Sequence, residues 1–542
     1  MSWQLLWFKR DLRVQDHPAL VAFCQTIKEQ GGLPLAFYAT EPSWWQQPDM
    51  SWRQAQFVED SLLELQPLLA AQGIPFVVVD GEVVPFLQKL AAVNPIAHLF
   101  SHQETGNAWS FQRDVAVASF CTQSQIEWMQ PIQHPIKRAG INRDTYDEFA
   151  YAFWSQPLCR VPDAIADELG DKSWQMLANV EGLISGNDLT QRLRNEGILS
   201  ARRYDWEHKG LFQRGGRSRG DLCLQRILQR NAENYLQTVA KPEQGAKFSS
   251  RLSPHLAWGT LSIREVMQQA RARLAQVSDK RNLRAFVSRL HWQSHFMQKL
   301  EAEAEMEFHC LHPMYEQVRV WSPEAQQRFE AWALGQTGIP FVDACMRSLR
   351  YCGWLPFRMR AMLMSFASYQ LWLPWQKTAP YLASLFTDYE PGIHYSQVQM
   401  QSGVTGINQM RVYNPVKQGL DHDPKGRFIL QFCPELQGLP LEYIHEPWQL
   451  SQEQQHRFGV VLTQDYPEPI VEHESAARSA KKAMAAVRQQ SQHREISQGV
   501  FVKHGSRLRP AQRQGGRVRK TGKTNPVIEQ AKQLRKNQME LF

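Results

Sequence analysis

The sequence predicts an α/β N-terminal domain with a doubly wound parallel sheet, followed by an all-α domain. Three observations lead to this expectation. In residues 1–130, short apolar runs alternate with longer stretches of helical spacing, which is typical of βαβ units. Beyond residue 221, helical spacing continues without further strand-like runs. The length of 542 residues also exceeds what one hydrophobic core usually organises, so more than one domain is expected.

The expected strands of the first domain lie at residues 4–8, 34–38, 75–79, 97–100 and 126–129. Residues 51–69, 83–92 and 107–121 have helical spacing and are expected to cross over between strands, which covers both faces of the sheet. No G-x-G-x-x-G motif follows the first strand, and this argues against a dinucleotide-binding domain of that type.

The rest of the chain divides into three expected segments. Residues 131–220 mix Gly, Pro, Arg and Asp with single aromatic residues, and we interpret them as an interdomain connection. The all-α domain is expected over residues 221–475, with helical spacing at 222–236, 261–275, 281–300, 324–334, 341–350 and 357–373. Residues 476–542 begin with a helical stretch and become rich in Gly, Arg, Lys and Gln, which predicts a basic flexible tail.

Composition and charge indicate a globular protein with a basic C-terminus. Hydrophobic residues make up 43% of the chain, and no apolar run reaches the roughly 18 residues of a membrane helix. The N-terminal residues lack the basic region and cleavage site of a signal peptide, so a cytoplasmic location is expected. The net charge is +8, whereas residues 501–542 alone carry eleven Lys or Arg and two Glu, or +9. A nucleic-acid-binding patch on the folded part must therefore come from local arrangement.

Common catalytic and metal motifs are missing. The sequence has no G-x-S-x-G, no H-E-x-x-H and no C-x-x-C, so its eight cysteines are expected to be buried reduced thiols. Eighteen tryptophans suit an aromatic redox cofactor and a stacked base, although each one taken alone is explained as core. In the run FSSRLSPHLAWGTLS at 248–262, hydroxyls precede a helix that starts with proline, and this predicts an anion site for a pyrophosphate. Helix capping is the alternative explanation of these serines.

Several long motifs in order resemble the photolyase and cryptochrome family up to about residue 475. They are WFKRDLR at 7–13, DHPAL at 16–20, the serine-rich run above, WALGQTGIPFVDACMR at 332–347, GW at 353–354, RMR at 358–360, RVYNP at 411–415, HEPW at 445–448 and YPEPIV at 466–471. The resemblance implies an all-α domain that binds FAD without a covalent bond. A four-cysteine iron–sulfur cluster, present in some relatives, is disfavoured because Cys310, Cys345, Cys352 and Cys433 include no close pair.

The resemblance also implies which residues contact the cofactor. Arg360 is expected to pair with Asp388 beneath the isoalloxazine ring, and Glu390 to lie near the ribose and the ring edge. His394 occupies the position where many members have an Asn opposite flavin N5. The other expected cofactor contacts, of which the first six line the phosphates, are Tyr235, Ser249, Ser250, Arg251, Leu252, Ser253, Gln293, Trp354 and Arg358.

The residues that match the family's lesion pocket depart from its usual pattern. Arg289 stands where dimer photolyases show Glu, Phe357 where they show Asn, and Met400 where a second Trp is usual. Trp292 and Phe357 offer aromatic faces to a flipped pyrimidine dimer. Arg289 is expected either to bond the thymine carbonyls and stabilise the radical anion, or to bind phosphate. We include His394 with these four as candidate catalytic residues.

Two further sites are implied by the resemblance. Glu104 matches the acid that binds the pterin in folate-binding members, so an antenna of folate or deazaflavin is expected between the domains, with a surface helix cap as the alternative. Trp375 and Trp321 match the middle and outer members of the family's electron-transfer chain, whereas Val398 replaces the member nearest the flavin. Photoreduction is therefore expected not to use the usual chain intact.

The leading hypothesis is a deoxyribodipyrimidine photolyase, a carbon–carbon lyase that splits pyrimidine dimers in DNA with light. The run HYSQVQMQSGVTGIN at 394–408 is similar to a prokaryotic group that acts on single strands, so single-stranded DNA is the expected substrate. A dimer in a single strand also avoids most of the flipping cost of a few kcal/mol. We expect a monomer. The alternatives are a blue-light receptor of cryptochrome type and a flavin-loaded DNA-binding protein without turnover.

Overall fold

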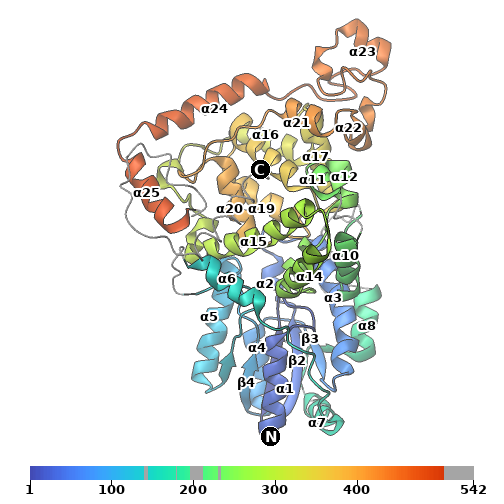
Figure 1. Ribbon diagram of the computed structural model, residues 1–542, viewed down its shortest axis with the longest axis vertical. Helices are drawn as coiled ribbons and strands as arrows, with labels where there is room; N and C mark the ends of the chain where they lie inside the picture. The colour runs from blue at the N-terminus through green and yellow to red at the C-terminus, as the bar shows by residue number, and fades with distance from the viewer. Residues whose placement is uncertain (139–144, 179, 196–210, 230–233, 506–542) are drawn as a thin grey trace.

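The computed structural model describes residues 1–138, 145–178, 180–195, 211–229 and 234–505 (Figure 1). The N-terminal α/β domain lies at one end of the molecule, and the helical domain covers the carboxyl edge of its sheet. None of the described helices is long and apolar enough to cross a membrane.

The sheet has six strands in the order β5-β4-β1-β2-β3-β6. The five expected strands are confirmed and pair in parallel. The sixth, β6, runs antiparallel to β3 and was not expected, because three residues are too few to show a period in sequence. The bounds are β1 (Trp3–Phe8), β2 (Leu33–Ala39), β3 (Phe76–Val79), β4 (Ile96–Phe100), β5 (Glu127–Met129) and β6 (Leu183–Ser185).

Helices cover both faces of this sheet, which confirms the doubly wound arrangement. One face packs on α1 (Pro18–Gln30) and α3 (Trp52–Ala70) and is continuous with the core of the helical domain. The other face packs on α4 (Val83–Val93) and α5 (Ala108–Gln123). A short α2 (Pro42–Trp45) follows β2.

The interpretation of residues 131–220 as a connection needs correction, because they carry secondary structure. Helix α6 (Tyr146–Ser155) packs into the helical domain, whereas α7 (Asp167–Leu177) and α8 (Gly186–Asn195) pack on the α/β domain. Their polar composition and short length hid them in the sequence. This segment therefore contributes to both domains instead of only joining them.

The helical domain follows the expected pattern. Its elements are α10 (Arg217–Gln229), α11 (Tyr235–Thr238), α12 (Pro242–Phe248), α13 (Ser253–Ala257), α14 (Ile263–Gln276), α15 (Arg281–Ala302), η2 (Ala304–Glu307), η3 (Pro313–Tyr315), α16 (Pro323–Leu334), α17 (Pro340–Cys352), α18 (Phe357–Ser365), the π-helix η4 (Phe366–Gln370), α19 (Trp375–Leu385), α20 (Pro391–Ser402), α21 (Pro415–His422), α22 (Arg427–Phe432), η5 (Pro434–Leu436), η6 (Pro447–Gln449) and α23 (Gln452–Phe458). Helices α15 and α20 cross closely at Gly392, where a Cβ would lie 2.6 Å from the Met297 Cα atom.

The helical stretch expected at the start of residues 476–542 is confirmed, but it is docked on the helical domain and is not part of a flexible tail. Helix α24 (His473–Arg488) buries Ala480, Met484 and Val487 against the helical domain, and α25 (His493–His504) follows it. These three residues recur at helical spacing and form one apolar face, which explains why α24 docks. Residues 506–542 lie outside the described part of the chain.

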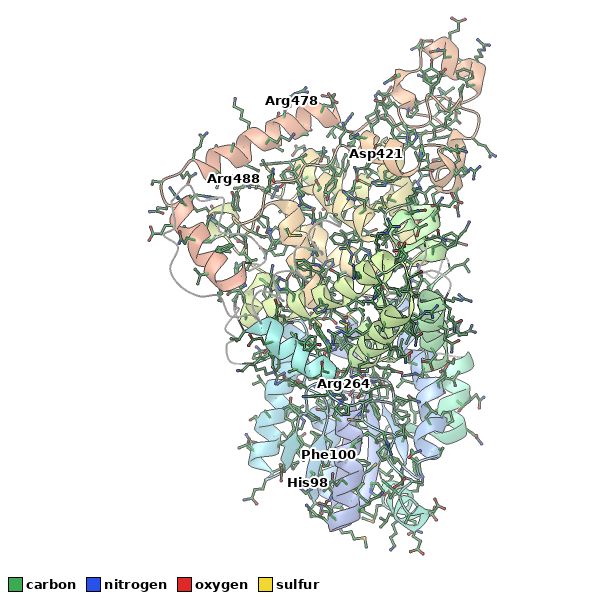
Figure 2. The ribbon with its side chains drawn as sticks, viewed as in Figure 1. His98, Phe100, Arg264, Asp421, Arg478 and Arg488 are labelled. Atoms are coloured by element: carbon green, nitrogen blue, oxygen red, sulfur yellow. The ribbon has the colours of Figure 1, made fainter. Side chains whose placement is uncertain are left out.

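The opening motif joins the two domains. After β1, the Arg10 Nε atom donates to the Ala257 carbonyl and Arg13 Nη1 to the Gly259 carbonyl, each at 2.9 Å. Figure 2 shows Arg264 of α14 at the same boundary, where its Nε atom donates to Asp16 Oδ2 at 3.1 Å. Gly259 has φ of 66°, and a Cβ there would lie 2.2 Å from the Arg10 carbonyl oxygen, so only glycine fits.

Candidate functional site

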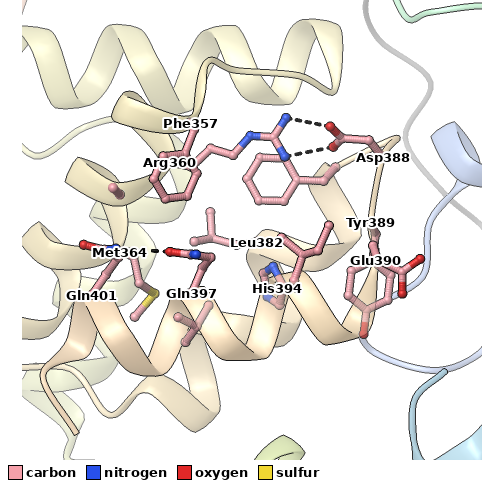
Figure 3. A pocket seen from close by; sticks show the side chains of 14 residues that line it. Phe357, Arg360, Met364, Leu382, Asp388, Tyr389, Glu390, His394, Gln397 and Gln401 are labelled. Carbon is pink, nitrogen blue, oxygen red and sulfur yellow. Dashed lines mark hydrogen bonds and ion pairs between the residues drawn. The ribbon is translucent and has the colours of Figure 1, made fainter. Parts of the chain in front are cut away.

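A pocket opens between α18, the end of α19 and α20, close to the domain boundary (Figure 3). It encloses about 530 Å³ of empty space, its open mouth included. Four of the expected cofactor residues line it, together with apolar and aromatic neighbours. The lining residues are Phe357, Arg360, Ala361, Met364, Leu382, Phe386, Asp388, Tyr389, Glu390, Ile393, His394, Gln397, Val398 and Gln401.

Arg360 and Asp388 form the expected ion pair on one wall of the pocket (Figure 3). Both guanidinium Nη atoms donate to the carboxylate, each at 2.9 Å, and this bidentate geometry is the strongest form of such a contact. The Arg360 guanidinium also lies 4.1 Å from the Phe386 ring centroid. The pair thus presents a fixed, planar polar edge to any ligand in the pocket.

His394 lies on the α20 side of the pocket as a neutral imidazole. Burial lowers its pKa to about 4, and its Nε2 atom donates to the Ala379 carbonyl at 2.9 Å. Since Nε2 carries the proton, Nδ1 is an acceptor. The rings of Tyr389 and Tyr395 contact the imidazole edge to face at 5.4 and 5.3 Å. A ring N–H of a ligand therefore finds an acceptor here.

Glu390 has a carboxyl oxygen that suits a ligand hydroxyl. Burial raises the pKa of Glu390 to about 7, while Arg10 lies 3.5 Å from its Oε2 atom. The Oε1 atom is buried and accepts no hydrogen bond from any described residue. Because buried polar atoms in folded proteins nearly always have a partner, this atom indicates a bound polar group.

The serine-rich loop lies next to the pocket. Helix α13 begins at Ser253 with Pro254 in its first turn, as expected, and Arg251 adopts a φ of 54° that non-glycine residues rarely take. The Arg251 guanidinium lies 4.2 Å from the Trp354 ring centroid, and Arg360 lies 6.0 Å from it. Trp354 thereby links the loop to the pocket, which fits an extended ligand with phosphates at one end.

The other expected cofactor contacts are distributed around this loop. Tyr235 is buried on α11 and hydrogen-bonded to Arg289 of α15. Within the loop, Ser249 and Leu252 are buried, Ser250 is half-buried, and Ser253 is exposed. Gln293 is buried on α15.

Arg358 is exposed and its guanidinium lies 5.9 Å from the Tyr413 ring centroid. It stands about 200° around α18 from Arg360, because each helical residue advances by about 100°. Arg358 therefore lies on the side away from the pocket.

Of the five candidate catalytic residues, Phe357 and His394 line the pocket. Phe357 is 44% exposed at its mouth. The ring of Trp292 stacks on that of Phe296, with 5.5 Å between their centroids. The residues that line the pocket do not include Trp292, Arg289 or Met400. The contact between Arg289 and Tyr235 favours the phosphate-binding alternative for this arginine.

The side chain of Glu104 is 6% exposed and lies at the carboxyl edge of the sheet, where ligands of open α/β sheets bind. Its carboxylate lies 2.7 Å from Arg113 Nη2 and 3.9 Å from Lys9 Nζ. The surface-cap alternative is wrong for Glu104, because Asn107 caps α5 by accepting from the Ser110 N–H. An antenna chromophore near Glu104 therefore remains an expectation from the sequence resemblance.

Trp375, at the start of α19, and Trp321, just before α16, do not line the pocket. Trp375 is buried, donates its indole N–H to Cys310 Sγ at 3.3 Å, and contacts the Tyr395 ring at 6.5 Å. Trp321 is half-buried beside Lys377 of α19. Val398 lines the pocket, as expected. Sequence reasoning missed Tyr389 and Tyr395, which occupy the gap between pocket and Trp375.

All eight cysteines are free. Among the described residues, one group of three side chains could hold a metal ion, and it consists of Asp11, His17 and His102 without any cysteine.

Comparison with protein families gives two matches. Residues 4–146 match the family described as DNA photolyase, and residues 286–486 match the FAD-binding domain of DNA photolyase. The second range contains the whole pocket, so the cofactor expected from the sequence, FAD, is confirmed at the level of the domain.

Individual relatives match over nearly full length. The deoxyribodipyrimidine photo-lyase of Salmonella typhimurium is 30% identical over 90% of this chain and 99% of its own. The cryptochrome DASH of Gloeobacter violaceus is 26% identical over 86% of this chain and 93% of its own. Among solved structures, the Sulfolobus tokodaii photolyase with two FAD molecules covers 90% of this chain and 100% of its own, at 21% identity and a TM-score of 0.68.

Proposed function

Because this chain belongs to the photolyase and cryptochrome family, we propose that it repairs cyclobutane pyrimidine dimers in DNA with light. FAD, reduced and bound in the pocket of α18 and α20, would supply and take back the single electron that splits the cyclobutane ring. The enzyme would then be a deoxyribodipyrimidine photolyase, a carbon–carbon lyase without net redox change.

The pocket is the observation that supports this proposal. Arg360 and Asp388 would orient the flavin ring through their rigid planar edge, and the Glu390 Oε1 atom would accept a hydroxyl of the cofactor. The serine-rich loop would hold the phosphates, with Trp354 beneath the connecting part of the ligand. Arg360, Asp388, Glu390 and His394 thus bring four charged or polar side chains together in one pocket.

His394 would control the proton nearest the flavin. With Nε2 fixed by the Ala379 carbonyl, its Nδ1 atom accepts a hydrogen bond and cannot donate a proton at neutral pH. Phe357, exposed at the mouth, would stack on the extruded dimer and exclude water from it. We assign Trp292 and Met400 to the outer part of the substrate surface and Arg289 to a phosphate.

Light-dependent removal of dimers by purified protein tests the activity. The protein should be reduced with dithionite, mixed with a dimer-containing oligonucleotide, and illuminated with blue light. Restored thymine absorbance in the light and none in the dark is the expected result. No repair of either single- or double-stranded substrate at full FAD occupancy would overturn the proposal.

We propose that single-stranded DNA is the preferred substrate. A flipped dimer in a duplex costs a few kcal/mol, and a pocket without the usual Glu, Asn and second Trp has less binding energy to offset this cost. The same oligonucleotide, free and annealed to its complement, gives the comparison. Faster repair of the free strand is expected, and equal or faster repair of the duplex contradicts the preference.

A blue-light receptor of cryptochrome type is the second candidate, because relatives named cryptochrome match over most of the chain. Full FAD content with light-induced reduction, and no repair in the assay above, would favour it.

A second chromophore, folate or deazaflavin, is proposed near Glu104. Its test is a gain in blue-light repair after that chromophore is added. We also propose that the protein acts as a cytoplasmic monomer.

A further inference from the structure

A buried tyrosine with a carboxylate partner lies in the wall of the pocket. Tyr389 is 3% exposed and lines the pocket next to His394 and Glu390 (Figure 3). Its hydroxyl donates to Asp49 Oδ2 at 2.6 Å, across 340 positions of sequence. Asn107 holds the same carboxylate oxygen at 3.1 Å, so that the α/β domain supplies the acceptor and fixes its orientation.

Asp49 is set up to take a proton. Its Oδ1 atom is buried and accepts no hydrogen bond from the described residues. Burial raises the pKa of Asp49, which makes the carboxylate more basic than an exposed one, while burial raises the pKa of Tyr389 and keeps the phenol neutral. The proton thus has a short path from Tyr389 to Asp49.

A second tyrosine continues the path away from the pocket. Tyr395 is buried and hydrogen-bonded to Tyr389. Its ring lies 6.5 Å from that of Trp375 in an edge-to-face contact. Aromatic side chains therefore connect the pocket wall to Trp375, although the position of the usual innermost tryptophan is occupied by Val398.

We propose that Tyr389 is the residue that gives an electron to FAD during photoreduction, with Asp49 as the proton acceptor. One electron leaves the Tyr389 ring for photoexcited oxidised FAD, and the phenolic proton moves to Asp49, which leaves a neutral tyrosyl radical. Tyr395, and behind it Trp375, passes an electron from an external thiol to this radical, and Asp49 returns the proton to the Tyr389 oxygen. The thiol thus supplies one electron for each electron delivered to the pocket and releases its own proton to solvent, while the phenolic proton only moves from Tyr389 to Asp49 and back.

The assignment rests on the proposed placement of FAD in this pocket, and it is independent of DNA repair. A phenol loses its proton when it is oxidised, so a positioned base determines the rate. Electron transfer to FAD is measured without DNA, whereas repair is measured on dithionite-reduced protein. Failure of one measurement therefore does not imply failure of the other.

The first test is the identity of the radical in the unmodified holoprotein. Illumination with a thiol present should give an EPR signal whose hyperfine structure changes when the protein contains ring-deuterated tyrosine, and Tyr389→Phe should abolish it. Asp49→Asn should slow photoreduction by about a hundredfold, the lower end of what a positioned proton acceptor contributes, and should remove a solvent deuterium isotope effect. Repair by both variants after dithionite reduction is measured separately and normalised to bound flavin, so that a loss of photoreduction is distinguished from a loss of repair.

Tyr466→Phe is the matched control, because Tyr466 donates to buried Asp343 in a similar pair and does not line the pocket. This variant should photoreduce at the unmodified rate. A double-mutant cycle of Tyr389→Phe and Asp49→Asn on thermal unfolding of the holoprotein in the dark checks the hydrogen bond without light. A purely tryptophanyl radical in unmodified protein, or full-speed photoreduction of Tyr389→Phe, would overturn the assignment.

Discussion

At the level of single residues, the Arg360–Asp388 pair is the contact on which the pocket depends most. Asp388 is 8% exposed, and its carboxylate receives both Nη atoms of Arg360. Removing one member of such a pair leaves the other charge poorly solvated.

Asp388→Asn should therefore lower the free energy of unfolding by about 2 kcal/mol, less than for a fully buried pair because the Arg360 side chain is 22% exposed. It should also lower the flavin-to-protein ratio after purification. Glu435→Gln, which breaks the Arg347–Glu435 pair between α17 and η5, is the control, and it should leave the flavin ratio unchanged. Equal flavin retention in both variants would contradict the placement of FAD.

His394 gives the residue-level prediction for pH. Its folded pKa of about 4 lies below the usual 6.5, so the unfolded chain binds a proton at a pH where the folded one does not. Its contribution to stability is complete above pH 6.5 and is lost as the pH falls toward 4, by at most about 3 kcal/mol.

His394→Asn should thus flatten the loss of stability between pH 7.5 and pH 4.5, measured as urea midpoints. The prediction is contradicted if His394→Asn and the unmodified protein lose stability in parallel.

At the level of elements, the crossing of α15 and α20 positions the pocket wall. Gly392→Ala would place a methyl group 2.6 Å from the backbone of Met297, so α20 must move away from α15. We expect a loss of about 1–3 kcal/mol, typical of overpacking, and weaker FAD binding.

Gly499→Ala on α25 is the opposite case, because a Cβ there meets nothing within 4 Å. This variant should be neutral or more stable by up to about 1 kcal/mol from helix propensity. Thermal melting and flavin titration of both variants check the pair of expectations, and similar flavin affinity in Gly392→Ala would count against α20 as a wall of the site.

Elements whose hydrophobic pattern continues over many residues were predictable from the sequence. The five parallel strands and the helices from α14 to α18 appear where the spacing indicated. In contrast, β6 and α6 to α8 are short or polar. The helical spacing of α24 was visible in the sequence, but its docking on the helical domain was not. Their positions depend on tertiary contacts, which local periodicity does not report.

The site was predictable only in part. The motif resemblance predicted that Arg360 pairs with Asp388, and the same motifs pointed to Glu390 and His394, which also line the pocket. The hydrogen bond from Tyr389 to Asp49 was not predictable, because it joins two domains across 340 positions. The sequence alone did not show which way the side chains of Arg358 and Arg289 point, because this depends on how each helix is rotated about its own axis.

For the whole molecule, the uneven charge predicts how DNA binding responds to salt. Residues 506–542 carry ten Lys or Arg and two Glu, a net charge of +8, while the rest of the chain is close to neutral. Truncation after Gly505 preserves α24 and α25. The truncated protein should bind DNA with a weaker dependence on salt. The slope of log affinity against log salt concentration should become less steep by about 0.7 for each phosphate that the protein no longer neutralises.

Binding titrations on single-stranded DNA at several salt concentrations measure this slope. The truncated protein should retain its flavin content and melting temperature, because α24, α25 and the pocket residues between Phe357 and Gln401 all remain. Identical slopes with and without residues 506–542 would contradict the prediction, because residues 1–505 alone would then determine the salt dependence of DNA binding.

The short strand β6 has a consequence for the fate of the newly made chain. It pairs with β3, whose sequence FVVV is entirely buried, through Val77–Ser185, Val78–Ile184 and Val79–Leu183. Without β6, this apolar strand would be an open edge, and such edges recruit strands from neighbouring chains. The three residues of β6 thus protect the edge of β3 against aggregation, and their loss should appear first as inclusion bodies instead of as altered light chemistry.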